Sequence, residues 1–574
     1  GSDESIRVDG SIISCSRAAD AEALGSAEVQ DIAIISEAKW LQSEHEQAYR
    51  QLIRYSRLLY AYQHNRRFAW GITVCGTVVR VVLFTHDFIF ASASMDVRRS
   101  EGRTEFIQFI VALSYCDESQ LGFDTTVTWC PTAQLWTIEC SDFNSENGAT
   151  VKYYARDPVL VAERKFGRHT RGFKASLDPS TVDTPDTFIK DAWPYASQEL
   201  ADTSRDELQI IRNIQDTLQA RGESTAGCVA AVHGGIVKFD AGTGEMVNDS
   251  TNAIIDPVLR EVATAISAKT AMSEANEDEA YGDGESKEAD IRFRVHRRIA
   301  IQPVGRPLYT FDSPYALIII LADAMEAHTR ILKTCGYLHR DLSINNIMGL
   351  VGQDGHVQGL LTDYDCTIKV GEARTLWPER TGTLPFMSIS NLLGSPIERT
   401  ELDDWESLLY IICWLGIHGI SGVEQLRYQA EVKRMRKADP FYDIPMEGWE
   451  IGTFEQVATV KTANLLTSRA FEKKILNHFK TGDGYDMLKK LALALYQFLF
   501  ENLYLPSVYH GVNELRITEE PITKEQILMG VAIRTMVNPF EKRIEKKDII
   551  VESLLEAMDF YKQKAEQAYK ADAS

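Results

Sequence analysis

Three oxygen-bearing side chains in the second half of the chain have types and a spacing that could hold a hard divalent cation beside a phosphate. Asn346 lies five residues after Asp341, and Asp363 lies a further 17 residues along the chain. Magnesium binds oxygen ligands, and phosphoryl transfer depends mainly on cations clamped to the phosphate oxygens and a nucleophile held in line. The pattern therefore indicates a phosphoryl-transfer site in which Asn346 and Asp363 hold magnesium and Asp341 orients the accepting hydroxyl.

The stretch between the two metal ligands predicts a β-hairpin. Its centre, Gly352-Gln353-Asp354-Gly355, is typical of a tight turn. Because a hairpin returns the chain to the edge from which it started, we expect Asn346 and Asp363 to meet at the same end of the paired strands.

The surrounding sequence resembles the catalytic loop and the magnesium-binding motif of protein kinases. The first motif is Tyr-Leu-His-Arg-Asp-Leu-Ser-Ile-Asn-Asn at 337–346, and the second is Leu-Leu-Thr-Asp-Tyr-Asp at 360–365. In the kinase pattern H-R-D-L-x-x-x-N, the resemblance makes Asp341 the catalytic base, with His339 and Arg340 as its catalytic neighbours. Either motif alone arises by chance, whereas their order, the offset of the Asn and the hairpin between them argue against coincidence.

Several further segments are similar to the fungal-type protein kinase family, so the resemblance covers most of the chain. These segments are 65–76, 303–308, 336–348, 381–387 and 403–407. The resemblance implies an α+β, bilobal protein-kinase-like fold with a β-rich N-lobe and a helical C-lobe. It also implies ATP and Mg2+ as cofactors and transfer to serine or threonine, but no particular protein substrate.

A kinase also requires a strand lysine that grips the α- and β-phosphates and a helix glutamate that fixes its ammonium. Lys190, in the β-like run Phe188–Asp191, is the candidate for the lysine. Glu207, on a helix expected from Ser204 to Thr217, is the candidate for its partner, with Glu199 as a weaker alternative. Their position relative to the catalytic loop carries this assignment, because lysines and glutamates are ordinarily surface residues.

The loop expected to cover the phosphates matches the kinase pattern poorly. Phe166–Phe173 keeps Gly167 and Gly172 as candidate nucleotide contacts but lacks the middle glycine of G-x-G-x-x-G. A side chain then stands where backbone alone would approach the phosphates, so low activity is expected.

The segment downstream of the metal motif resembles other kinase landmarks. Arg380–Met387 is similar to the end of an activation segment, and Asp403–Leu408 is similar to the start of the next helix. In the family, the counterpart of Asp404 braces the catalytic-loop backbone. Ser390 stands where a glutamate would bond a C-lobe arginine, so we expect a less firmly anchored segment.

Arg340 directly precedes the catalytic aspartate, and its guanidinium could pair with a phosphate on the activation segment. We therefore expect regulation by phosphorylation of Thr375, Thr381 or Thr383. A structural role is the alternative for Thr383.

Composition shifts and turn signals predict the domain organisation. We expect an N-terminal α+β domain over 1–150, a kinase N-lobe over 151–304, a C-lobe over 305–540 and a C-terminal helix over 541–574. The acidic stretch from about 240 to 290 is expected to be a disordered insert, because it cannot bury enough apolar surface to order itself. In the first domain, the patterns predict helices at 43–63 and 103–114 and strands at 71–75, 78–84 and 88–91.

A second, weaker pattern lies near the N-terminus. Asp31, Glu37 and Lys39, with Gln51–Tyr55 on the following helix, resemble the core of restriction-nuclease-like folds. Alternation puts Glu37 and Lys39 on one face of a strand, where acidic groups would hold a metal in an active nuclease. A Glu-x-Lys triplet arises by chance in a chain this long, so a degenerate or purely structural domain is the favoured interpretation.

The composition of the 574-residue chain limits its class and its partners. With 44% hydrophobic and 25% charged residues, it is typical of a globular protein of two or more domains. A net charge of -21 would repel nucleic acid and anionic membranes, so protein or small-molecule partners are expected and nucleic acid is not.

Nine scattered cysteines and the lack of a long apolar run favour an intracellular protein, cytoplasmic or nuclear, without a membrane span. The opening Gly1-Ser2 is compatible with a removed upstream signal.

Two other function classes stay open at this point. A pseudokinase scaffold with a weak nucleotide site is favoured by the irregular glycine loop, whereas an enzyme is favoured by the presence of Asp341, Asn346, Asp363 and Lys190. A small-molecule phosphotransferase shares the fold and the metal ligands, because fold does not fix substrate. The kinase-like activation segment weighs against it. The physiological substrate, the pathway and the oligomeric state stay open as well.

Overall fold

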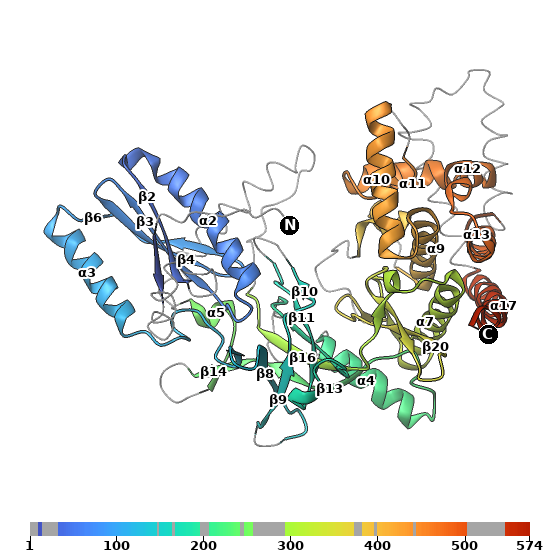
Figure 1. Cartoon of the computed structure of the whole chain (residues 1–574), viewed down its shortest axis with the longest axis horizontal. Helices are drawn as coiled ribbons and strands as arrows, with labels where there is room; N and C mark the ends of the chain where they lie inside the picture. Colours follow the sequence, from blue (N-terminus) through green and yellow to red (C-terminus); the bar gives the residue numbers. More distant parts are fainter. Residues whose placement is uncertain are drawn as a thin grey trace. The chain divides into compact units, whose positions relative to one another are not determined.

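The computed structural model describes most of the chain in two compact units. The described residues are 10–13, 32–145, 148–162, 167–195, 206–240, 246–255, 293–371, 382–394, 399–439, 444–501 and 546–573. The first unit comprises residues 1–203 and 231–304, and the second comprises residues 204–230 and 305–574. Figure 1 labels the helices and strands of both units.

The N-terminal part of the first unit is a six-stranded sheet with a helix on each face (Figure 1). Its elements are β1 (Gly10–Ile13), β2 (Ile32–Lys39), α2 (His45–Tyr62), β3 (Ala69–Cys75), β4 (Val78–Phe84), β5 (Ile89–Ala91), β6 (Met95–Asp96) and α3 (Ser100–Ser114). Ile34 and Ile35 of β2 point to opposite faces, as strand alternation requires. Ile35 packs in the cluster that contains Leu52 of α2, and Ile34 packs in the cluster that contains Phe109 of α3. The predicted helices and strands of this region are confirmed.

The second sheet of the first unit has eight strands in the order β13-β16-β12-β11-β9-β8-β7, with β10 beside β11. They are β7 (Val127–Cys130), β8 (Leu135–Ser141), β9 (Thr150–Ala155), β10 (Leu160–Val161), β11 (Arg171–Ser176), β12 (Thr187–Ala192), β13 (Ala230–Ile236) and β16 (Arg297–Gln302). Alternate side chains such as Ile138, Phe173 and Ile189 form its buried core. The strand β12 carries Lys190.

The domain boundary expected near residue 150 falls inside this sheet. β8 and β9 form a hairpin in which Ile138 is paired with Tyr153, and β7 pairs with β8 on its other side. The polar run between these strands is therefore a turn of one sheet and not a passage between domains. Residues 127–141, expected in a separate N-terminal domain, belong to the sheet that carries Lys190.

The acidic insert expected from about residue 240 has regular structure at its beginning. β14 (Lys238–Asp240) pairs with β15 (Met246–Asn248), and the short helix α5 (Thr251–Ile254) follows. Asp249 between them is fully buried. The most acidic stretch, 274–290, lies outside the described residues.

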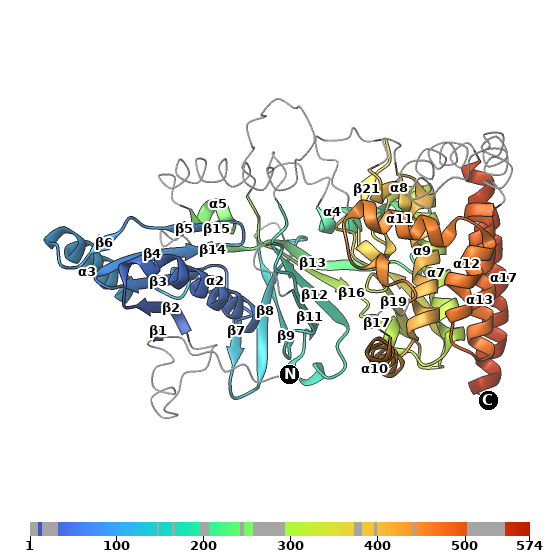
Figure 2. The same cartoon turned by 90° about the horizontal axis from the view of Figure 1, so that it is seen from above.

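The second unit is predominantly helical around a small sheet. Its helices are α4 (Glu207–Ala220), α7 (Pro314–Cys335), α8 (Ile389–Leu392), α9 (Glu401–His418), α10 (Gly422–Ala438), α11 (Phe454–Leu465), α12 (Ser468–Lys474), α13 (Asp483–Tyr496) and α17 (Lys547–Ala573). Its strands are β17 (Arg306–Pro307), β18 (Tyr337–Leu338), β19 (Ile347–Val351), β20 (Val357–Leu361) and β21 (Ile368–Lys369). Figure 2 shows the expected C-terminal helix, α17, lying beside α13. Lys562 of α17 forms an ion pair of 2.6 Å with Asp323 of α7, so α17 is packed onto this unit.

The helix α9 is apolar on all sides and lies in the core of the second unit. Trp405, Leu409 and Cys413 are completely buried, which is typical of a helix enclosed by others. Thr400 and Asp403 form a capping box at its start.

Among the described residues, no single helix is long and apolar enough to cross a membrane. α9 meets that test only as a pair with α10, at an angle of 72°.

Candidate active site

The hairpin β19–β20 brings the two predicted metal-ligand segments together in the second unit. Ile347 is paired with Leu361, so Asn346 stands directly before the first strand and Thr362 directly after the second. The backbone N–H and the hydroxyl of Thr362 both donate to the carbonyl of Asn346, at 2.9 and 3.1 Å. The predicted hairpin is confirmed, and Asp363 follows one residue after the joined ends.

The side chain of Asn346 ties the metal-ligand segment to the catalytic loop. Its Nδ2 donates to the backbone carbonyl of Asp341 at 2.8 Å, and the residue is buried. Because the amide nitrogen is used in this way, the amide oxygen is the atom left to accept or to ligate. An amide oxygen is the donor that a hard cation prefers.

Two residues of the site adopt the left-handed backbone region that non-glycine residues avoid. Arg340 has φ 71° and Asp363 has φ 64°. Such conformations cost on the order of 1–3 kcal/mol and persist only where the surroundings require them. The backbone N–H of Arg340 donates to Asp404 Oδ2 at 3.1 Å, and its carbonyl accepts from Arg399 Nη2 at 2.7 Å. The buried Asp404 therefore braces the catalytic loop, as the kinase resemblance implies.

His339 bridges the two loops through its ring. Nε2 donates to the carbonyl of Thr362 at 3.0 Å, while Nδ1 accepts from the backbone N–H of Asp341 at 3.3 Å. Burial lowers the pKa of His339, an effect that the charge of Asp404 opposes. A neutral ring with one donor and one acceptor fits both bonds. His339 was predicted among the catalytic residues; its ring is buried and bonded to backbone on both sides, which favours a positioning role.

The carboxylate of Asp341 is held by the activation segment. The backbone N–H and the hydroxyl of Thr383 both donate to Asp341 Oδ1, each at 2.9 Å. The structural alternative for Thr383 is thereby favoured over a regulatory phosphosite. Thr375 and Thr381, the other predicted phosphosites, lie outside the described residues.

A group of three carboxylates lies beside the metal motif. Glu207 begins α4, and its Oε1 accepts from the backbone N–H of Tyr364 at 3.1 Å. Oxygens of Glu207, Asp363 and Asp365 lie within 4.8 Å of one another. A shared cation, a shared proton or a basic side chain relieves the repulsion between carboxylates this close. Oxygen atoms are the donors that Mg2+ prefers, so the donor set fits Mg2+.

Asp365 is a residue of this site that the sequence reasoning did not assign. The available signal was its position, because it stands third in Asp-Tyr-Asp, where the kinase motif D-F-G has glycine. A glycine has no side chain to offer. An aspartate at that position adds a third carboxylate to the group that could hold a cation.

A sequence model described as fungal protein kinase matches residues 7–416, which is well over half of the chain. The chain belongs to the fungal protein kinase family. A solved structure entitled "Structure of vaccinia related kinase 3" is similar over 68% of this chain and 95% of that chain, with 10% identity and a TM-score of 0.33. The family match carries the assignment of a protein kinase with a kinase-like fold, β-rich in its N-terminal part and helical in its C-terminal part.

The candidate nucleotide-binding residues of this fungal protein kinase lie in the first unit. Lys190 is on β12 as predicted, paired with Gly172 on β11 and with Ile299 on β16. A side chain at Gly172 would meet the Phe188 ring at 2.4 Å, so close strand packing by itself requires glycine there. Gly167 has φ 137°, a conformation that favours glycine. The pairing of Lys190 with Glu207 and the nucleotide contacts of both glycines stay predictions.

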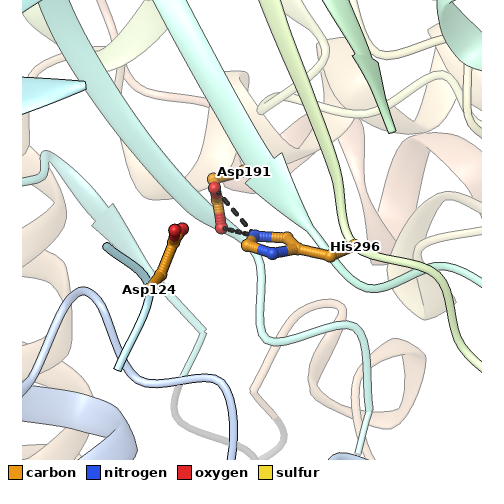
Figure 3. A group of neighbouring side chains, drawn as sticks. All are labelled: Asp124, Asp191 and His296. Carbon is orange, nitrogen blue, oxygen red and sulfur yellow. Dashed lines mark hydrogen bonds and ion pairs between the residues drawn. The ribbon is translucent and has the colours of Figure 1, made fainter. Parts of the chain in front are cut away.

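A buried charge network lies on the opposite face of the lysine strand. Asp191, next to Lys190, accepts from His296 Nε2 at 3.0 Å and from Arg298 Nε at 2.7 Å. Figure 3 shows the His296 ring beside the Asp191 carboxylate, with Asp124 nearby. Arg298 Nη2 donates to Asp124 at 2.6 Å, so its guanidinium joins the two carboxylates.

This network has the geometry of a metal site but the charges of an ion-pair cluster. Burial alone would lower the pKa of His296, but the charge of Asp191 and hydrogen bonds to Asp191 and Asp249 raise it to about 9. The ring is therefore protonated near neutral pH. A metal ion would meet this cation and the Arg298 guanidinium, so the cluster serves to join Asp124 to β12 and β16.

The weaker N-terminal pattern is only partly assembled. Lys39 Nζ donates to Glu37 Oε1 at 2.6 Å, and the Tyr55 hydroxyl donates to Glu37 Oε2 at 3.1 Å. Asp31 lies outside the described residues. Among the described residues, neither of the groups that could hold a metal includes Glu37. A structural role is favoured for this end of β2, and nuclease activity is not proposed.

Asp191→Asn should lower the free energy of unfolding of this kinase by about 3–5 kcal/mol, because it leaves the buried cations of His296, Arg298 and Arg171 short of a carboxylate. Urea denaturation followed by circular dichroism measures the change. Asp183→Asn is the matched control, since Asp183 forms an ion pair with Arg156 at the surface and should leave the midpoint unchanged. Equal effects of both substitutions would contradict the role assigned to the network.

His296 should make stability depend on pH in the alkaline range. Folding raises its pKa from 6.5 to about 9, so the protonated ring stabilises the folded state fully below pH 6.5. That contribution, roughly 3 kcal/mol, is lost as the pH rises through about 9. Urea unfolding from pH 6 to 10 should show the stability gap between wild type and His296→Gln closing over this range. The exposed His356→Gln is the control, and a gap that does not change with pH would refute the prediction.

Proposed function

We propose that this family member is an ATP- and Mg2+-dependent protein kinase that transfers the γ-phosphoryl group to serine or threonine hydroxyls. The observation that carries the proposal is the orientation of Asp341. Its carboxylate is fixed by Thr383, and its backbone is bonded to both His339 and Asn346. Such a fixed carboxylate, one loop away from metal-binding oxygens, is what in-line phosphoryl transfer needs.

In the proposed mechanism, Asp341 accepts the proton of the attacking hydroxyl. Asn346 and Asp363 hold Mg2+ through oxygen atoms, and Asp365 is a further candidate ligand. When bound, the ion neutralises charge on the phosphate oxygens. Lys190 is proposed to bind the α- and β-phosphates, with Glu207 orienting it.

Serine or threonine specificity is supported by the position of Thr383. Its hydroxyl lies 2.9 Å from Asp341 Oδ1, so the activation segment passes directly beside the catalytic carboxylate. The space at that carboxylate then favours a short hydroxyl side chain. The resemblance to fungal-type protein kinases points the same way.

The pseudokinase alternative depends on the glycine loop, which lacks its middle glycine. Against it stands the second unit, where the backbone of the catalytic loop is held in a strained conformation at Arg340 by buried partners. A scaffold has no need to maintain that strain. A small-molecule phosphotransferase is disfavoured because segment 383–390 is firmly attached beside Asp341.

Asp341→Asn should lower transfer of radiolabelled phosphate from Mg2+-ATP to a mixture of serine and threonine peptides by about 100-fold or more, because the general base is lost. Asp363→Ala should abolish transfer by removing a metal ligand. Asp354→Asn, in the exposed hairpin turn, is the control and should keep wild-type activity. Wild-type rates in both site variants would show that the site is misplaced.

Asp365→Asn should weaken binding of Mn2+, used as a spectroscopic substitute for Mg2+, by about tenfold in the presence of ATP, since one of three neighbouring carboxylates is neutralised. Electron paramagnetic resonance of free Mn2+ measures the affinity independently of turnover. Asp312→Asn replaces an exposed aspartate of the same unit and should leave the affinity unchanged. An unaltered affinity in Asp365→Asn would exclude this residue from the cation site.

A further inference from the structure

Lys461 of α11 is a completely buried lysine directed at the activation segment. Its Nζ donates to the backbone carbonyl of Met387 at 2.7 Å and approaches that of Leu384 at 3.5 Å. The amino group also lies over the rings of Tyr410 and Trp449, 4.2 and 5.2 Å from their centroids. Lysines are almost never buried to this extent without specific partners. The two carbonyls and the two aromatic faces are such partners.

Glu406 of α9 holds the next part of the segment. Its Oε1 accepts from the backbone N–H of Ile389 at 2.7 Å and from the Tyr410 hydroxyl at 2.6 Å. Burial lowers the pKa of Lys461 well below its ordinary value, and the charge of Glu406 opposes that change. Lys461 and Glu406 therefore belong to one buried polar group that shares Tyr410.

Asp403 of α9 holds the end of the segment through two hydroxyls. Asp403 Oδ1 accepts from Ser388 Oγ at 2.6 Å and from Ser390 Oγ at 3.2 Å. The weaker anchoring expected from Ser390, which replaces a glutamate of the kinase pattern, is therefore not found in the described part of the segment. The attachment is built from buried backbone and hydroxyl contacts instead of one glutamate–arginine pair.

We propose that Lys461, acting with Glu406, is a positioning residue that fixes segment 383–390 so that a protein substrate is presented to Asp341. Thr383 holds the start of the segment by its hydrogen bonds to Asp341, and Lys461 and Glu406 hold the backbone of Met387 and Ile389. Only three residues separate Thr383 from Met387. A shift of Met387 therefore also moves the contact between Thr383 and Asp341. This role rests on the proposed transfer to protein hydroxyls.

Lysine suits this position for geometric reasons. A single ammonium or amine can donate to two carbonyls from the end of an unbranched stem. The planar fork of arginine matches a carboxylate better than two separate carbonyls. The residue provides no atom that touches the reacting groups, so its effect should be seen on the acceptor side of the reaction.

The test is Lys461→Met, which keeps an unbranched buried side chain and removes the donor. Hydrogen–deuterium exchange of peptides covering 383–392 should become at least about tenfold faster. The kcat/KM for a peptide substrate should fall on the order of 10- to 100-fold. Hydrolysis of ATP by water and the Kd of Mg2+-ATP should change less than about twofold, because the nucleotide side is untouched.

Two further variants complete the design. Lys473→Met removes an exposed lysine of the neighbouring helix α12 and should behave as wild type in every measurement. Lys461→Gln keeps an N–H donor and should give an intermediate exchange rate. It also keeps the inference testable if Lys461→Met does not fold.

The outcomes separate the positioning role from the proposed function. Unchanged exchange over 383–392 in Lys461→Met and Lys461→Gln, or faster exchange throughout α7 and α9 as well, would overturn the positioning role. Equal losses of peptide phosphorylation and of ATP hydrolysis would overturn it too. If the wild-type protein transfers no phosphate while Lys461→Met still loosens only this segment, the proposed function fails and the attachment by Lys461 stands.

Discussion

The catalytic loop depends on one buried carboxylate, that of Asp404. It accepts from the backbone N–H of Arg340 and from His328 Nε2, at 3.1 and 2.8 Å. Burial alone would raise the pKa of Asp404, but the hydrogen bond and charge of His328 hold it below its ordinary value, so the acceptor stays ionised. A hydrogen bond to a charged acceptor is stronger than one to a neutral acceptor, so this bond helps to compensate the left-handed backbone of Arg340. Asp341 follows Arg340 directly in the chain, so the hydrogen bond between Asp404 and Arg340 also fixes the position of Asp341.

The strand β12 serves two purposes because its side chains alternate. Lys190 lies on one face and Asp191 on the other. Asp191 is fixed by His296 and Arg298, and Arg298 extends the attachment to Asp124, 174 residues away in the sequence. A strand held this firmly on its buried face has little freedom to turn its other face. The region before the kinase-like strands is thereby part of what orients the candidate nucleotide lysine.

Sequence reasoning succeeded where the determining contacts are local. The hairpin 347–361, the strand of Lys190 and the helix of Glu207 follow from turn residues and periodicity within short windows. It was less successful where one local pattern fits two different structures, or where the contacts of a side chain decide its role. The boundary near residue 150 could not be placed because a polar run looks alike in a hairpin and in a linker. The motif shows that His339 lies close to Asp341 but not which atoms its ring contacts, so its role stays a prediction.

The contacts of Lys461 and Glu406 were equally beyond local pattern. Lys461 lies 74 residues after Met387, and nothing in its neighbourhood distinguishes it from a surface lysine. Glu406 stands in a segment that was identified for Asp404. A charged residue can be recognised in a sequence by its spacing from a motif. Its contribution to stability depends mostly on whether it is buried, and burial is set by tertiary packing.

The first two turns of α9 carry the acidic side chains that hold both the catalytic loop and the activation segment. Asp404 holds the catalytic loop, Asp403 holds the serines that end the activation segment, and Glu406 holds the backbone of Ile389. Acidic side chains are favoured near a helix N-terminus, where the dipole and unpaired N–H groups are positive. Because α9 is buried in the core of its unit, both chain segments take their positions from one enclosed element. The Thr383–Asp341 contact then forms between two parts whose separation is already set, which explains how an irregular loop and an irregular segment can meet within hydrogen-bond distance.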